Sequence, residues 1–321
     1  ALTQAHRGRP TRFHELNLDK WAGREDRGSM EALAGTLDEL QAQGHLVTKV
    51  GKHPVAVFWH EDRAWAIDDR CPHLGLPLHR GTVESGMVTC HWHHARFDLS
   101  SGCTLDPWAD DASASDIDIR DGRVFVSPRA QADPKGRLFA RLEDSLEDQI
   151  TLVAAKSVLG LLELDVPVAD IVAVGARFGA ANRSSGWSSG MTVLTAMANV
   201  LPGLDPDDHA LALTQALSFL ARDVGGHAPR FGLDPLDGAD LDVGRLTDWY
   251  RRFIDTRSAD AAERALATAL ADPEVATTEV EAMMFAAVTD HVFIDEGHTV
   301  DFTNKAFELI DLVGPDSAPL L

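Results

Sequence analysis

Hydrophobic and polar positions alternate between residues 45 and 126, in short runs separated by turn residues. Three of these runs cover residues 45–50, 55–59 and 64–67, and residues 60–63 supply the turn of a hairpin between the last two. Residues 86–89 and 123–126 also read as short strands. Short strands joined by tight turns predict a small antiparallel β domain.

After residue 128 the hydrophobic period changes from two residues to between three and four, which is typical of helices. Asp205 and Pro206 provide the cap and the first-turn proline of a helix that we expect to run to about Val224. We predict a capping box at residues 278–281 and a helix end at residues 314–315. One further stripe has apolar or small residues three or four positions apart, namely Leu146, Ile150, Val153, Ser157, Leu161 and Leu164.

These patterns predict a two-domain α+β fold, in which a small antiparallel all-β domain is followed by an all-α helical domain. We assign residues 1–36 to an N-terminal extension and residues 37–128 to the β domain. A polar linker then covers residues 129–140, and the helical domain covers residues 141–321.

The composition argues against several classes of protein. Lys and Arg number 29 and Asp and Glu 50, so the formal charge is −21, which repels phosphate backbones and argues against nucleic-acid binding. No apolar run approaches the roughly 18 residues of a membrane span, and the first ten residues lack the apolar stretch of a secretion signal. Three cysteines argue against a disulfide scaffold, and we expect a cytoplasmic protein. Cys103 is expected to be a small buried apolar side chain.

The residues that point to chemistry are two short motifs within the β domain. Cys71-Pro-His73 is followed, after sixteen residues, by Cys90-His-Trp-His93. Each motif offers one thiolate and one imidazole, so the four donors could bind zinc tetrahedrally. They also fit a two-iron cluster, in which both cysteines bind one iron and both histidines bind the other.

The stretch that contains these motifs resembles a Rieske [2Fe–2S] domain. The resemblance runs from about Leu37 to Ser127 and rests on both motifs, on Gly81 between them and on residues 96–98 after the second motif. It implies that the buried iron is bound by Cys71 and Cys90, and that the outer iron is bound by His73 and His93. A zinc ribbon is the alternative.

One residue departs from the family pattern, because the family usually has glycine directly after the second histidine and this chain has His94. His91 and His94 are therefore alternative imidazoles, although the C-x-x-H spacing favours His93. We interpret His79, His91 and His94 as surface or supporting polar residues.

The resemblance also implies a low reduction potential. High-potential members of the family have an extra cysteine in each loop, together with a Ser and a Tyr that donate hydrogen bonds to sulfur. Here Leu76 and Trp92 exclude the disulfide, Ala95 has no hydroxyl and Phe97 has no phenol. The reduced cluster is then stabilised less.

The helical domain contains a second candidate site, at residues 290–301. Two histidines and one carboxylate form the open-sided ligand set of oxygen-activating ferrous iron. His291, His298 and Asp301 could form it at a mononuclear non-haem iron, with further candidates in Asp295, His227 and Asp223. The alternative interpretation is that these residues cap helices and complement the helix dipoles.

Three hypotheses follow for the function. The first is a Rieske-type oxidoreductase in which the cluster supplies electrons to the helical domain, where a small organic substrate is oxygenated. Its donor would be a flavin reductase or a ferredoxin, since the chain has no G-x-G-x-x-G segment in a βαβ unit. The second is an electron-transfer protein whose helical domain docks to a partner or forms a homo-oligomer. The third is a redox sensor.

Overall fold

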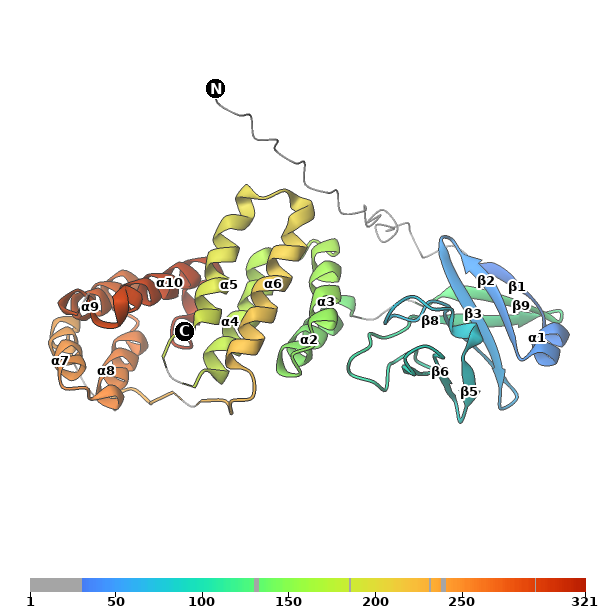
Figure 1. Ribbon diagram of the computed structural model, residues 1–321, viewed down its shortest axis with the longest axis horizontal. Coiled ribbons are helices and arrows are strands. Elements are labelled where there is room, and N and C mark those ends of the chain that lie inside the picture. The colour runs from blue at the N-terminus through green and yellow to red at the C-terminus, as the bar shows by residue number, and fades with distance from the viewer. Residues whose placement is uncertain (1–30, 130–132, 185, 231, 238–240, 292) are drawn as a thin grey trace, which may run out of the picture. The chain divides into compact units, whose positions relative to one another are not determined.

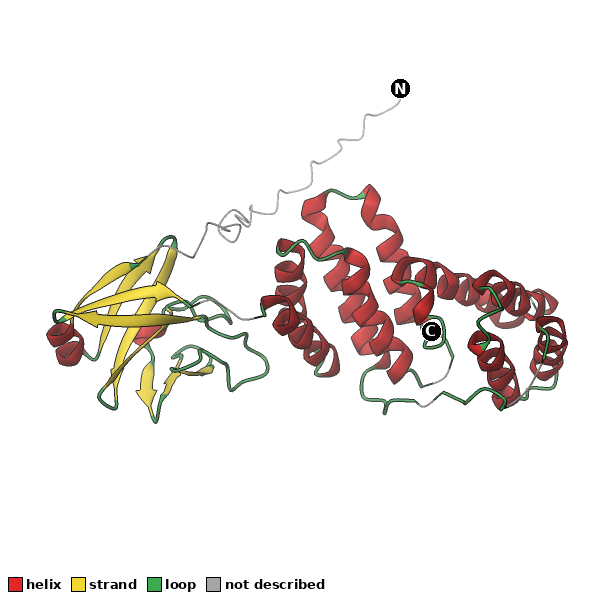
Figure 2. Cartoon of the chain, turned by 180° about the vertical axis from the view of Figure 1, so that it is seen from behind, coloured by secondary structure: helices red, strands yellow, loops and turns green. Residues whose placement is uncertain are grey.

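The computed structural model describes residues 31–129, 133–184, 186–230, 232–237, 241–291 and 293–321. The chain divides into two compact units, Ala1–Ala132 and Asp133–Leu321 (Figure 1). The described part of the first unit consists mainly of β-strands, and that of the second consists of helices (Figure 2). The predicted fold class, an antiparallel β domain followed by a helical domain, is confirmed.

The first unit contains two antiparallel sheets. The larger has the strand order β1-β9-β8-β4-β3-β2, and the smaller has the order β5-β6-β7. The strands are β1 (Ala32–Thr36), β2 (His45–Val50), β3 (His53–His60), β4 (Arg63–Asp68), β5 (Thr82–Glu84), β6 (Met87–Thr89), β7 (Arg96–Asp98), β8 (Ala114–Arg120) and β9 (Arg123–Pro128). A short helix α1 (Leu37–Gln43) follows β1, and the 3-10 turn η3 (Leu78–Arg80) precedes β5.

The β3–β4 hairpin forms where the sequence places it. His60 pairs with Arg63, so the loop has two residues, Glu61 and Asp62, with φ angles of 50° and 55°. Two successive positive φ angles define the turn whose twist matches that of the flanking strands.

Alternation along β3 places side chains on both faces of the larger sheet. Val55 and Val57 pack in one apolar cluster with Leu40 of α1. Ala56 and Phe58 pack in a second cluster that also contains both cysteine motifs. The sheet is therefore buried on both faces, and one face supports the candidate cluster site.

The second unit contains the helices α2 (Pro134–Glu147), α3 (Thr151–Glu163), α4 (Val168–Asn182), α5 (Ser189–Val200), α6 (Pro206–Val224), α7 (Val243–Asp255), α8 (Ala259–Ala271), α9 (Thr277–Asp290) and α10 (His298–Val313). The 3-10 turns η4 (Leu201–Gly203), η5 (Ile294–Gly297) and η6 (Pro315–Ser317) lie between or after them. The main core is formed by α2–α6 with Leu309 of α10, and a smaller core by α7–α9. No described helix combines the length and the apolar character that crossing a membrane requires.

Two elements begin earlier than the predicted boundaries. Strand β1 lies inside the predicted extension 1–36 and pairs with β9, while residues 1–30 are outside the described part of the chain. Helix α2 begins inside the predicted linker 129–140, because Asp133 accepts a hydrogen bond from the Gly136 N–H and Pro134 occupies the first turn.

Two details of the helical prediction were wrong. The stripe from residue 146 to 164 belongs to two helices, because the chain turns at residues 148–150, where Gln149 has a φ angle of 58°. Helix α9 begins at Thr277, and it is Glu279 that accepts the hydrogen bond from the N-cap Ala276 N–H, at 3.0 Å. The predicted start of α6 at Pro206 and its predicted end near Val224 are confirmed. The predicted end of α10 at residues 314–315 is confirmed as well, since the helix ends at Val313.

Candidate iron–sulfur centre

The first cysteine motif lies in a loop that leaves β4. The Cys71 N–H donates to the Leu76 carbonyl and the Gly75 N–H donates to the Cys71 carbonyl, both at 2.7 Å. These two bonds turn the chain so that residues 72–74 project from the loop. Gly81 follows η3, and a Cβ at that position would lie 2.5 Å from the Thr89 carbonyl oxygen of β6. Only glycine permits this close approach between the two cysteine-bearing segments.

The second motif repeats the same backbone pattern between β6 and β7. The Cys90 N–H donates to the Ala95 carbonyl at 2.8 Å, and the His94 N–H donates to the Cys90 carbonyl at 3.0 Å. His94 therefore corresponds to Gly75 of the first loop. The φ angles agree, since Gly75 has 83° and His94 has 62°. The departure from the family's glycine thus falls on a left-handed backbone position, which non-glycine residues adopt at a cost.

The structure brings the four predicted ligands together as two pairs. The Cys71 and Cys90 side chains are buried, 3% and 2% exposed, and interact with each other. The His73 and His93 rings meet edge to face, with centroids 4.6 Å apart, and His93 is exposed. Each iron of a two-iron cluster takes two protein ligands, so a pair of thiols beside a pair of imidazoles fits the group.

Electrostatics at the cysteines is consistent with iron binding. Burial raises the pKa of the Cys71 thiol, the His73 N–H acts in the opposite direction, and the neighbouring Cys90 raises the pKa further. Two buried thiolates are unfavourable side by side without a positive counter-charge. Iron supplies that charge, and ligand thiols lose their protons when they bind metal.

A third segment, residues 99–112, packs against the two loops and was not identified from the sequence. The Asp106 carboxylate is buried and accepts from the Arg96 N–H at 2.8 Å, from Nη2 at 2.7 Å and from Nε at 3.2 Å. The Trp108 ring meets His73 edge to face, with centroids 5.0 Å apart. Gly102 is needed at this segment, because a Cβ would collide with the Ala112 carbonyl. The sequence signal in this segment was the pair Asp106-Pro107, which favours the start of a turn.

His79 and His91 make contacts away from the four predicted ligands. His91 Nε2 lies 2.7 Å from Thr82 Oγ1. His79 Nδ1 lies 2.8 Å from Asp69 Oδ2, and the His79 N–H donates to Oδ1 of the same buried carboxylate. His79 therefore supports the turn after the first loop.

Cys103 is exposed, so the expectation that it is buried was wrong. Its backbone bonds to Asp98 and Ser101 keep it in a surface turn.

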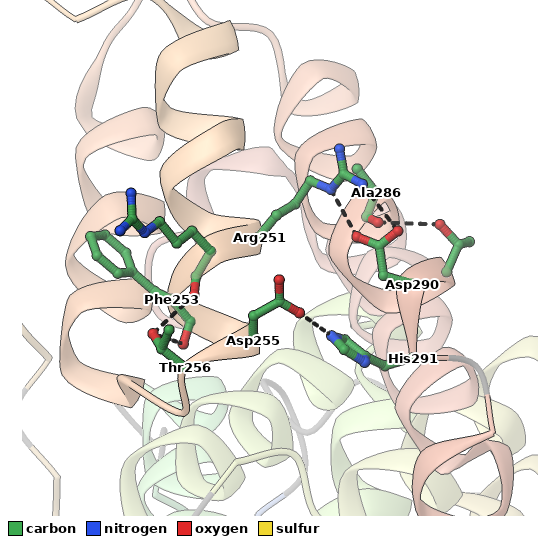
Figure 3. A network of polar contacts seen from close by, with 9 residues as sticks. Arg251, Phe253, Asp255, Thr256, Ala286, Asp290 and His291 are labelled. Atoms are coloured by element: carbon green, nitrogen blue, oxygen red, sulfur yellow. Dashed lines mark hydrogen bonds and ion pairs between the residues drawn. The ribbon is translucent and has the colours of Figure 1, made fainter.

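In the second unit, residues of the predicted metal site make contacts within the protein (Figure 3). His291 Nε2 lies 2.9 Å from Asp255 Oδ1 at the end of α7. Nearby, the Arg251 guanidinium bonds both oxygens of Asp290 and holds the pKa of that carboxyl below its usual range. His298 begins α10 and stacks on Phe302, with ring centroids 5.2 Å apart.

The other members of that predicted set are dispersed. Asp301 is exposed in the first turn of α10, and His227 is exposed after α6. Asp223 accepts from the Gly190 N–H at 2.6 Å, at the start of α5. The Asp295 side chain lies outside the described part. Among the described side chains, no three of His, Cys, Asp and Glu form a group that could hold one metal ion. The non-haem iron site stays a prediction.

Comparison with known proteins assigns the first unit. Residues 31–115 match the family model of the Rieske [2Fe–2S] domain. The chain is 32% identical over 94 residues to the anthranilate 1,2-dioxygenase ferredoxin subunit of Burkholderia cepacia, covering 29% of this chain and 87% of that subunit. It is 30% identical over 92 residues to a human Rieske domain-containing protein, covering 27% of this chain and 59% of that protein.

A third relative is human apoptosis-inducing factor 3, which is 37% identical over 68 residues, or 21% of this chain. The chain spans 11% of that relative and 59% of the Rieske domain-containing protein. One of these relatives is a ferredoxin subunit of a dioxygenase, and each of the three matches covers less than a third of this chain. Through its first unit, the chain belongs to the Rieske [2Fe–2S] family, whose domain carries a two-iron cluster.

Proposed function

We propose that this protein exchanges single electrons with a redox partner through its Rieske domain. Cys71 and Cys90 would hold one iron of the [2Fe–2S] cluster, and His73 and His93 would hold the other. When bound, the cluster supplies reversible one-electron oxidation and reduction. The observation that carries the proposal is the pairing itself, in which two buried thiols lie beside two imidazoles in ring contact.

The surroundings of the four residues suit this role. The thiols are in the apolar cluster beneath the sheet, where water is excluded. His93 is exposed, so one of the imidazoles lies where a partner protein can approach. Trp108 packs on His73 and restricts the movement of its ring. The donor would be a flavin reductase or a ferredoxin, and we place the protein in the cytoplasm.

Metal analysis and a ligand exchange test the proposal. The purified protein should contain two irons and two acid-labile sulfides per chain and show a reduced-state paramagnetic signal. The substitution His93→Cys should retain the cluster and shift its absorption toward the four-thiolate type, whereas His91→Ala and His94→Ala should leave the spectrum unchanged. Colourless protein that contains zinc would refute the proposal. Loss of the cluster in His94→Ala but not in His93→Cys would overturn the ligand assignment.

The finer proposal is that the helical domain receives the electrons and oxygenates a small organic substrate. Its support is the concentration of histidines and carboxylates between α9 and α10, and the alternatives are a docking or dimerisation module and a redox sensor. A third, sulfide-free metal per chain, lost in His291→Ala and His298→Ala while the cluster spectrum persists, would support oxygenation. Two irons with nothing further would favour the alternatives.

A further inference from the structure

The two loops that contain the predicted ligands differ in charge from the rest of the chain. We call residues 70–81 and 90–96 the cluster loops. They contain three arginines and no aspartate or glutamate, in a chain whose formal charge is −21. Two carboxylates that bond residues of the cluster loops, Asp69 and Asp106, are buried and pair with His79 and Arg96. The exposed charge of the cluster loops is therefore positive.

Two of the three arginines carry a positive charge that no ion pair neutralises within residues 31–129. Arg70 and Arg80 are exposed, and within residues 31–129 neither forms an ion pair in the structure. Arg96 is half exposed, but Asp106 neutralises it. At physiological ionic strength charges are screened beyond about 8 Å. A protein that docks on the cluster loops would therefore respond to these two guanidinium groups more than to the net charge of the chain.

The same loops expose two large apolar side chains. Leu74 is 54% exposed and follows the ligand His73, and Trp92 is 53% exposed and precedes the ligand His93. The Trp92 ring stacks on His93 with centroids 4.7 Å apart. Tryptophan and arginine are the residues most enriched at the energetic centres of protein interfaces. An exposed tryptophan beside an exposed imidazole gives a partner apolar contact where electron transfer requires close approach.

We infer that the cluster loops are the docking surface for an acidic redox protein. Trp92 and Leu74 would anchor its apolar contact, while Arg70 and Arg80 would select its negative surface, because complementary charge steers encounter and suppresses wrong partners. This inference rests on the proposed electron-transfer function and adds the chemistry of the partner to it.

Interfacial electron transfer tests the inference with a defined acidic surface. We would adsorb the full-length, cluster-loaded protein on gold covered by carboxylate-terminated or amine-terminated alkanethiol monolayers and measure the electron-transfer rate by voltammetry. Despite the charge of −21, the faster response should occur on the carboxylate surface. The double substitution Arg70→Glu with Arg80→Glu should lower that rate about tenfold, the smallest effect typical of electrostatic steering. The control, Arg63→Glu with Arg123→Glu, makes the same charge change at exposed positions outside the cluster loops.

The apolar anchor is tested separately by Trp92→Ser, which should slow the response on carboxylate at high salt as well as at low salt. An equal or faster rate on amine-terminated gold would overturn the inference, as would equal losses in the loop and control variants. A dimer that depends on Trp92 in sedimentation would also overturn it, because a second copy would then be the occupant. Solution potentiometry separates the two proposals: without a one-electron signal in solution the proposed function fails, whereas a normal signal without the surface preference refutes only the docking inference.

Discussion

The left-handed backbone at His94 predicts that removing this side chain increases the stability of the domain. His94 has a φ angle of 62° and is exposed, and the equivalent position of the first loop is occupied by Gly75. A side chain at such a position strains the backbone, and glycine removes the strain. The substitution His94→Gly should therefore stabilise the loaded domain, although it deletes a side chain beside a predicted ligand.

The magnitude is the difference between two terms. The left-handed conformation costs an L-residue roughly 1–2 kcal/mol. Glycine increases the conformational entropy of the unfolded chain, which lowers the free energy of unfolding by about 0.4–1 kcal/mol. The net stabilisation is about 0.5–1 kcal/mol, because the structure gives the exposed His94 side chain no hydrogen bond to lose among the described residues. If the loop opens during unfolding, this lengthens the half-life about two- to fivefold.

The matched control is His91→Gly in the same loop. His91 does not have a positive φ angle, and its ring bonds Thr82 Oγ1 at 2.7 Å. The substitution His91→Gly removes an exposed hydrogen bond and increases the conformational entropy of the unfolded chain. It should therefore lower the free energy of unfolding of the domain by about 1 kcal/mol. The assay is the decay of the visible circular dichroism of the cluster at one elevated temperature. Two variants that both shorten the half-life would refute the account of His94.

Three further predictions concern the same domain. The midpoint potential should lie below about +100 mV, in the lower part of the Rieske range, and Ala95→Ser should raise it in a potentiometric titration; an unchanged midpoint would show that a hydroxyl at this position does not reach the cluster. Asp106→Asn should cost about 2 kcal/mol in urea unfolding at pH 7, since it breaks charged hydrogen bonds to Arg96. Arg96 holds the folded pKa of Asp106 below its unfolded value, so this stability is present above the unfolded pKa and disappears as the pH falls through the folded one; a cost that persists unchanged well below both pKa values would contradict the assignment. Trp108→Ala should accelerate loss of the cluster more than Trp92→Ala does, because Trp108 packs against the apolar cluster as well as His73, while Trp92 stacks on His93 from an exposed position; equal rates for the two would argue against Trp108 as a support of His73.

Much of the protein could be read from the sequence because the deciding interactions are short in range. The β3–β4 turn depends on two residues with positive φ angles, and the start of α6 depends on Asp205 and Pro206. The spacing of each Cys–His motif is a local property as well, since a loop of five or six residues determines which side chains can point the same way. The fold class and the helical nature of the second unit follow from such patterns, and the cluster type follows from the family resemblance that the two motifs carry.

Other structural features depend on contacts between segments that are far apart in the sequence. The stripe from residue 146 to 164 keeps a helical period across the turn at Gln149, because α2 and α3 both face the same core. Strand β1 exists because β9 offers it an edge, and the Asp106–Arg96 and Trp108–His73 contacts join residues at least ten positions apart. The residues around one position do not indicate which distant segment will pack against it. Strand pairing and side-chain packing in the folded chain determine these contacts. The Asp106–Arg96 and Trp108–His73 contacts support the two loops whose Cys–His spacing was evident from the sequence.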